Sequence, residues 1–219
     1  MRCQISPTPT VFHNLVTPSV ILTLSLFANS SLHAVQVPTT APAQTGKQTE
    51  SKDSEFTIDN DHTSIIFAVS HFGLSYTYGR FNQCSGGFSL QAGQLTKPGF
   101  AFKIEADSID TNQDERDKHL KGPDFFDTKN FPTIDFVTTE FTKVDGVYQV
   151  KGNMTMLGKT QPLTMPVQLV GIGTGPFGKQ RAGFFTKFTI KRSDFGMDEM
   201  KMKIGDNISV TFSFEGIKK

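Results

Sequence analysis

Two short polar clusters stand where the sequence could hold a charged or polar group. They are Arg116-Asp117-Lys118-His119 and Lys191-Arg192-Ser193-Asp194. Each combines cations with an acid at a point where the alternation of apolar and polar residues stops. Arginine and protonated histidine donate charge-assisted hydrogen bonds to anionic or carbonyl groups. The clusters therefore suit a polar collar, a ring of side chains that binds the head group of an amphiphile. They equally suit Arg–Asp pairs that fix two loops, and both interpretations stay open.

Other arrangements that would support catalysis or metal binding are missing from the sequence. His62, His71 and His119 lack the i,i+2 or i,i+4 spacing that places two ligands on one face of a strand or helix. The chain has no phosphate loop, dinucleotide fingerprint or Gly-x-Ser-x-Gly elbow. Cys84 has no histidine near it in the sequence, which predicts a buried, unreactive thiol. We therefore expect no metal site and no catalytic residues.

The composition excludes several classes of protein. The chain has 219 residues with 22 basic and 21 acidic side chains, so it lacks the basic field of a dedicated nucleic-acid binder. A hydrophobic fraction of 37% is too high for a disordered chain, and two cysteines are too few for a disulfide scaffold. The 21 phenylalanines, with no tryptophan, indicate a large aromatic interior.

The N-terminal third is expected to lie outside the folded domain. An apolar run from Val20 to Ala28 is shorter than the roughly 20 residues needed to span a bilayer, and it follows a start that carries Arg2 and no acid. We interpret residues 1–34 as a signal peptide and residues 35–54 as a flexible linker. Residues 55–219 then form one domain, exported to the periplasm, with no membrane-spanning segment.

Period-two alternation dominates that domain and predicts an all-β fold. Such alternation gives each strand one apolar and one polar face, as in antiparallel sheets. Eight strands of this kind form a sandwich or a closed barrel, and we favour an eight-stranded antiparallel barrel, whose interior is filled by side chains or holds one small ligand. The expected strands are 56–70, 77–90, 100–105, 133–142, 148–156, 163–169, 183–191 and 207–215.

One segment, 108–123, predicts a short helix instead. Thr111 is placed to cap it, and Gly122-Pro123 to end it. Glu115 and His119 are spaced i,i+4, which favours a salt link along the helix. The pair Phe125-Phe126 follows, framed by acids. A helix and two aromatic rings inserted between strands would lie at the mouth of a barrel.

An ordered set of motifs resembles the YceI-like family of bacterial exported proteins from about residue 55 to 216. The resemblance implies an extended lipocalin-like barrel that holds a polyisoprenoid or similar amphiphile, such as an isoprenoid quinone or polyprenyl pyrophosphate. It implies no catalysed reaction, and it is compatible with a homodimer. Leu157 stands where relatives often have histidine. The motifs are Asp59-x-x-His62-Thr63, Val69-x-His71-Phe72-Gly73, Gly79-Arg80-Phe81, Arg116-Asp117-x-His119-Leu120, Asp124-Phe125-Phe126-Asp127, Phe131-Pro132-x-Ile134, Gly152-Asn153-Met154-Thr155-Met156, Arg192-Ser193-Asp194-Phe195-Gly196-Met197 and Gly205-Asp206.

Together these patterns predict a protein that binds and carries or sequesters a long-chain isoprenoid or amphiphilic lipid, of polyprenyl or quinone type, in the periplasm. No cofactor is expected apart from such a bound lipid or quinone. The alternative is an enzyme that acts on such a lipid, a hydrolase or isomerase. A third possibility is a structural or partner-binding protein whose barrel is packed without a cavity. The expected ligand-binding residues are the collar and the inward-facing apolar side chains: His71, Phe72, Arg116, His119, Phe125, Phe126, Phe136, Met154, Met156, Phe188, Arg192, Val210 and Phe212.

Overall fold

The computed structural model describes residues 53–219, which form ten strands, one α-helix and three short 3-10 turns. The predicted signal peptide, residues 1–34, and nearly all of the predicted linker lie outside the described residues. The helix is α1 (Asp114–Leu120), and the turns are Ala106–Ser108, Pro176–Gly178 and Arg192–Phe195. The strands are β1 (Ser54–His71), β2 (Ser75–Phe81), β3 (Cys84–Gln91), β4 (Gln94–Glu105), β5 (Ile109–Asp110), β6 (Thr133–Val144), β7 (Val147–Met156), β8 (Lys159–Thr174), β9 (Gln180–Lys191) and β10 (Ile204–Lys218).

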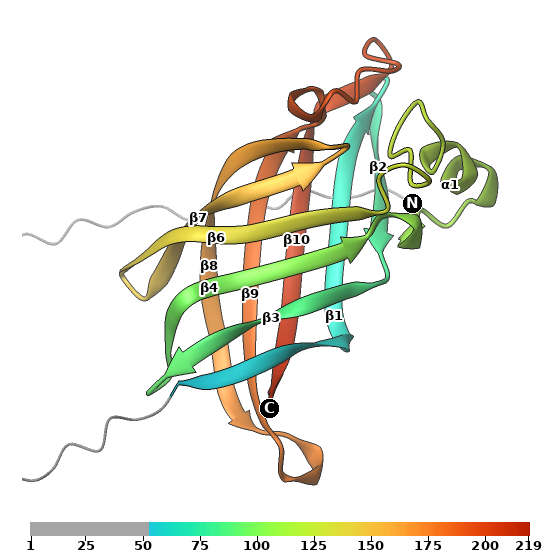
Figure 1. Cartoon of the computed structure of the whole chain (residues 1–219). Coiled ribbons are helices and arrows are strands. Elements are labelled where there is room, and N and C mark those ends of the chain that lie inside the picture. Colours follow the sequence, from blue (N-terminus) through green and yellow to red (C-terminus); the bar gives the residue numbers. More distant parts are fainter. Residues whose placement is uncertain (1–52) are drawn as a thin grey trace, which may run out of the picture. The chain divides into compact units, whose positions relative to one another are not determined.

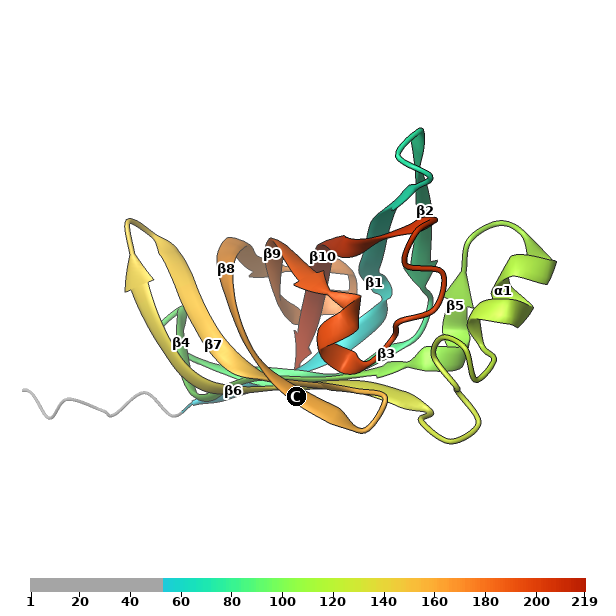
Figure 2. The same cartoon turned by 90° about the horizontal axis from the view of Figure 1, so that it is seen from above.

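Eight of the ten strands close into an antiparallel barrel (Figure 1). Their order is β10-β9-β8-β7-β6-β4-β3-β1, and β10 pairs again with β1 to complete the circle. The predicted all-β barrel with one short helix is therefore confirmed. The two remaining strands, β2 and β5, extend the sheet from β1 toward α1 (Figure 2).

The long strand β1 explains how a closed barrel can carry this extension. Its first residues, 54–57, pair with β3, whereas residues 65–71 pair with β2. The prediction of one strand over 77–90 is wrong because β2 and β3 follow different halves of β1. The break falls at Asn82 and Gln83, whose N–H groups both donate to the Ser108 hydroxyl at 3.1 Å.

Phenylalanine side chains fill one part of the barrel. Phe88, Phe100 and Phe184 pack with ring centroids 5.0–5.7 Å apart, and each is at most 4% exposed. Edge-to-face contacts of this kind add to the free energy gained by burying the rings. The inward phase of β3, β4 and β9 brings these residues together, which matches the predicted aromatic interior.

The helix α1 differs in detail from the expectation. Its N-cap is Gln113, whose side chain accepts a hydrogen bond from the Arg116 N–H at 2.5 Å. The predicted cap Thr111 instead bonds Asp117 and Arg116 through its hydroxyl. No helix within residues 53–219 is long and apolar enough to cross a membrane.

Candidate ligand cavity

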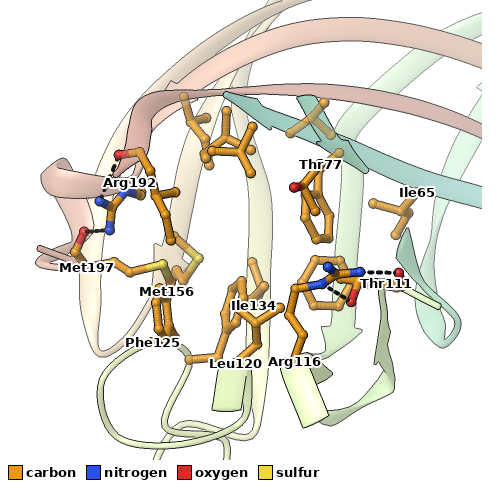
Figure 3. A pocket seen from close by; sticks show the side chains of 18 of the residues that line it. Ile65, Thr77, Thr111, Arg116, Leu120, Phe125, Ile134, Met156, Arg192 and Met197 are labelled. Carbon is orange, nitrogen blue, oxygen red and sulfur yellow. Dashed lines mark hydrogen bonds between the residues drawn. The ribbon is translucent and has the colours of Figure 1, made fainter. Parts of the chain in front are cut away.

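A cavity of about 670 Å³ lies inside the barrel beside α1. Its walls come from strands β1, β2, β4, β6, β7, β9 and β10, and from α1 and the segments that follow α1 and β9. Figure 3 shows Ile134, Leu120, Phe125 and Met156 around this space, with Arg116 and Arg192 on different sides of it. A cavity of this size is in the range that holds a small amphiphile.

Apolar side chains make most of the wall. Alternate residues of a strand point to the same face, so β1 contributes Ile65, Phe67 and Val69, and β10 contributes Val210 and Phe212. Removing an apolar chain from water into such a space is favourable by about 0.8 kcal/mol per methylene. The wall therefore suits a hydrocarbon tail.

Arg116 supplies one cationic group to the cavity wall. Its Nε donates to the Thr111 hydroxyl and its Nη2 to the Thr111 carbonyl, both at 2.7 Å. The Asp117 carboxylate accepts from the Thr111 N–H at 3.0 Å, so one threonine organises both charged residues. No Arg116–Asp117 ion pair forms, and the guanidinium keeps donors for another group.

Arg192 supplies a second cation and is 3% exposed. Its guanidinium donates to the carbonyls of Gly205, Met197 and Ile204 at 3.1, 2.8 and 3.2 Å. No ion pair within residues 53–219 includes Arg192, so the predicted alternative of a pair with Asp194 is wrong. The guanidinium is held instead by the Met197 carbonyl of the following loop and by two carbonyls at the start of β10.

The loop around Arg192 is further held by Asp206. Its carboxylate accepts from the Ser193 N–H at 3.0 Å and from the Ser193 hydroxyl at 2.9 Å. Burial raises the pKa of Asp206, but the Ser193 hydrogen bonds and the nearby Arg192 and Lys191 outweigh it, so the pKa is lowered. Asp206 is thus a fixed negative charge near the buried cation.

The comparisons with known proteins agree with this geometry. The model of the YceI-like domain matches residues 56–216. The chain belongs to the YceI-like family. It is 39% identical over 174 residues to a UPF0312 protein of Shewanella denitrificans, covering 76% of this chain and 88% of that one.

Two solved structures show the same fold as this YceI-like chain. Burkholderia cenocepacia BcnA superposes with a TM-score of 0.64 at 21% identity, over 72% of this chain and 98% of the other. A polyisoprenoid binding domain from Saccharophagus degradans, implicated in plant cell wall breakdown, gives a TM-score of 0.59 at 15% identity, over 75% and 98%. At these identities the similarity establishes the barrel.

The YceI-like cavity brings together most of the predicted binding residues. Two do not line it: Phe72 is 51% exposed beside His71, and Phe136 is buried next to Phe102. Their contact with a ligand, like that of the others, stays a prediction. The predicted residues that line the cavity are His71, Arg116, His119, Phe125, Phe126, Met154, Met156, Phe188, Arg192, Val210 and Phe212.

Several lining residues were not predicted. Phe67 shares the inward phase of His71 on β1, and Phe81 lies at the end of β2, so strand phase could have found both. Met197 and Met200 line the cavity from a loop without periodicity, and no sequence pattern indicates them. The predicted salt link between Glu115 and His119 is replaced by a contact between His119 and Asp124, whose Nε2 and carboxylate oxygen lie 3.4 Å apart.

A cluster of possible metal ligands lies away from the cavity lining. Atoms of Asp59, His62 and Glu215 lie within 4.8 Å of one another. Arg181 Nη1 lies 2.5 Å from the Asp59 carboxylate and 3.0 Å from the Glu215 carboxylate. A guanidinium therefore already supplies the positive charge between the two acids, and the arrangement is that of an ion-pair network joining β1, β9 and β10.

Proposed function

We propose that this YceI-like protein binds a long apolar lipid of isoprenoid type with a polar head, and carries or sequesters it in the periplasm. The observation that carries the proposal is a cavity of about 670 Å³ with apolar walls and two guanidinium groups that form no ion pair within the described domain. The polyisoprenoid binding domain with the same fold supports the ligand class. The predicted signal peptide supports export.

The two ends of such a ligand have different partners in the cavity. The tail gains from the apolar wall, whereas the head group meets Arg116 and His119 on α1 and Arg192 opposite them. Each charge-assisted hydrogen bond to the head contributes about 1.5–3 kcal/mol. Quinone carbonyls and polyprenyl phosphates both accept such bonds, so both are candidate heads. The ligand leaves unaltered, since the proposed role is binding.

The test is native mass spectrometry of protein exported and purified with its bound lipid. Organic extraction then gives the mass of the lipid, and incubation of emptied protein with ubiquinone or a polyprenyl phosphate measures its uptake. We expect one lipid per protein chain, recovered with unchanged mass. Protein that is always empty and takes up neither compound would contradict the proposal, and a changed ligand mass would favour a hydrolase or isomerase.

A pair of variants on β10 provides the control. Val210→Asp places a carboxylate in the apolar wall and should abolish binding, because burying an unpaired charge is costly. Ser213→Asp places the same carboxylate three residues along the strand at an exposed position and should leave binding unchanged. Circular dichroism of both variants confirms that the barrel has folded.

A further inference from the structure

The cavity ends abruptly partway along the barrel. On β4, Ile104 lines the cavity and Phe102, the next inward residue, does not. On β6 the same holds for Ile134 and Phe136. On β10, Phe212 is the last lining residue before Phe214. Three strands therefore change from cavity wall to packed interior at one level.

Phe102 lies behind this floor, packed against the lining residue Phe212. Its ring centroid is 4.9 Å from that of Phe212 and 6.3 Å from that of Phe136, and it is 4% exposed. Phe136 in turn packs against Gly152, where an added Cβ would lie only 2.4 Å from the ring. Phe212 therefore closes the cavity, and Phe102 and Phe136 support its ring from behind.

Below the floor the barrel is solid. The ring centroid of Phe102 lies 4.9 Å from that of Phe214 and 5.7 Å from that of Phe100, and the last two side chains are each 1% exposed. Phe184 packs behind them, at 5.0 Å from Phe100 and 5.5 Å from Phe214. A tail that reaches Phe212 can go no further, because the packed rings behind it do not yield without a large loss of packing.

The volume above the floor gives the length of tail that fits. A group the size of a water molecule occupies about 30 Å³, so about 670 Å³ holds roughly 22 methylene-sized groups. The polar head that meets Arg116 and Arg192 takes part of the same volume, so the space left corresponds to a tail of at most about four isoprene units. Further units of a longer tail would have to stay outside the barrel.

We propose that Phe102, supported by Phe136 and Phe212, sets the length of the apolar tail that the barrel accepts. This inference rests on the proposed function and adds a specificity to it. The floor acts as a stop: affinity rises with each unit that enters the cavity and stops rising when the tail meets Phe212, whose ring Phe102 holds in place. Removing that ring frees the volume of about six carbons, which is close to one isoprene unit.

The test is a competition among prenyl diphosphates of three to eight isoprene units, offered in equal amounts to the full protein. Native mass spectrometry reads the occupancy of each length, and the constant head group cancels its own contribution. We expect wild-type occupancy to peak at or below about four units. In Phe102→Ala the preferred tail should be longer by about one isoprene unit. The occupancy of this longer tail, relative to that of the tail preferred by wild type, should be at least about 10-fold higher in the variant than in wild type.

Phe184→Ala is the matched control. It removes the same ring from the same aromatic interior, but none of the ring contacts of Phe184 involves Phe102, Phe136 or Phe212. Its void is walled off from the cavity, so stability should fall while the preferred length stays. Ile134→Phe, which adds bulk at a lining residue above the floor, should move the peak down and keeps the test usable if Phe102→Ala fails to fold.

The outcomes separate the two proposals. Binding of all lengths in proportion to their hydrophobicity, or an equal shift in Phe184→Ala and Phe102→Ala, would overturn the role of Phe102 and leave the proposed function standing. Absence of binding for every length, in protein whose fold is verified by circular dichroism, would overturn the role of Phe102. If the same protein also takes up no ubiquinone, the proposed function is overturned as well. A peak that moves up with Phe102→Ala and down with Ile134→Phe supports both.

Discussion

Arg192 Nη1 donates to the main-chain carbonyl of Met197 at 2.8 Å, and the same guanidinium reaches the carbonyls of Ile204 and Gly205. One side chain thus joins the two ends of the segment between β9 and β10. Figure 3 shows the bond to Met197 at the edge of the cavity. The loop and the cavity wall are therefore held by one buried cation.

Replacement of Arg192 should lower stability first. Arg192→Ala leaves three carbonyls without their donor, and each buried unsatisfied group costs about 1–3 kcal/mol. The total is about 3 kcal/mol or more, so we expect Tm to fall by at least about 6 °C. Arg192→Lys keeps the charge but loses the planar fork and should recover only part of this loss. Calorimetry measures both, with Lys191→Ala, an exposed neighbour, as control. An unchanged Tm in Arg192→Ala would contradict the structural role.

Arg116 should act on the ligand more than on the fold. The hydrogen bonds of its side chain are with Thr111 alone among residues 53–219, in a partly exposed setting, so Arg116→Ala should shift Tm little. Loss of a charge-assisted hydrogen bond should weaken binding of a prenyl phosphate about 10- to 150-fold. A prenyl alcohol of the same length should lose much less. Lys118→Ala, two residues along α1 and outside the cavity lining, should change neither affinity.

The sequence predicted those parts of the molecule that follow a period. Strand phase placed Met154, Phe188 and Val210 on the inner face, because alternation and burial dictate the same register. The split between β2 and β3 escaped prediction, since it depends on which half of β1 each strand pairs with.

The loops escaped prediction for a related reason. Arg192 bonds carbonyls up to 13 residues away, and no side-chain pattern indicates which carbonyls will face it. The cavity floor was also not predictable, because alternation gives Phe102 and Ile104 the same inward phase and says nothing of where the space ends. Such features depend on the three-dimensional packing of several strands at once.

Cys84 should be unreactive in the folded protein. Burial raises the pKa of its thiol to about 12, and it is 6% exposed, so almost no thiolate forms at neutral pH. In a Cys3→Ser variant, which leaves Cys84 as the only cysteine, Ellman's reagent should give no signal under native conditions and one thiol per chain in guanidinium chloride. Rapid reaction of the folded protein would show that β3 is more accessible than its packing indicates.

The ion-pair network at Asp59 should make stability depend on pH in a defined direction. Burial raises the pKa of Asp59, but hydrogen bonds from Arg181 and His62 and the charges of both outweigh it, so the pKa is lowered from its ordinary value in the folded state. A lowered folded-state pKa stabilises the protein above the unfolded value, and this contribution is lost as pH falls through the folded value. Asp59→Asn should therefore lower Tm at pH values above about 5, where the carboxyl group is ionised in both the folded and the unfolded protein. The difference from wild type should shrink below about pH 4.

Asp61→Asn is the control, since that side chain is exposed and forms no hydrogen bond within residues 53–219, and it should leave Tm unchanged at every pH. Thermal unfolding of the three proteins across this range checks the prediction, and a difference between Asp59→Asn and wild type that persists undiminished in acid would show that Asp59 acts through packing rather than through its charge.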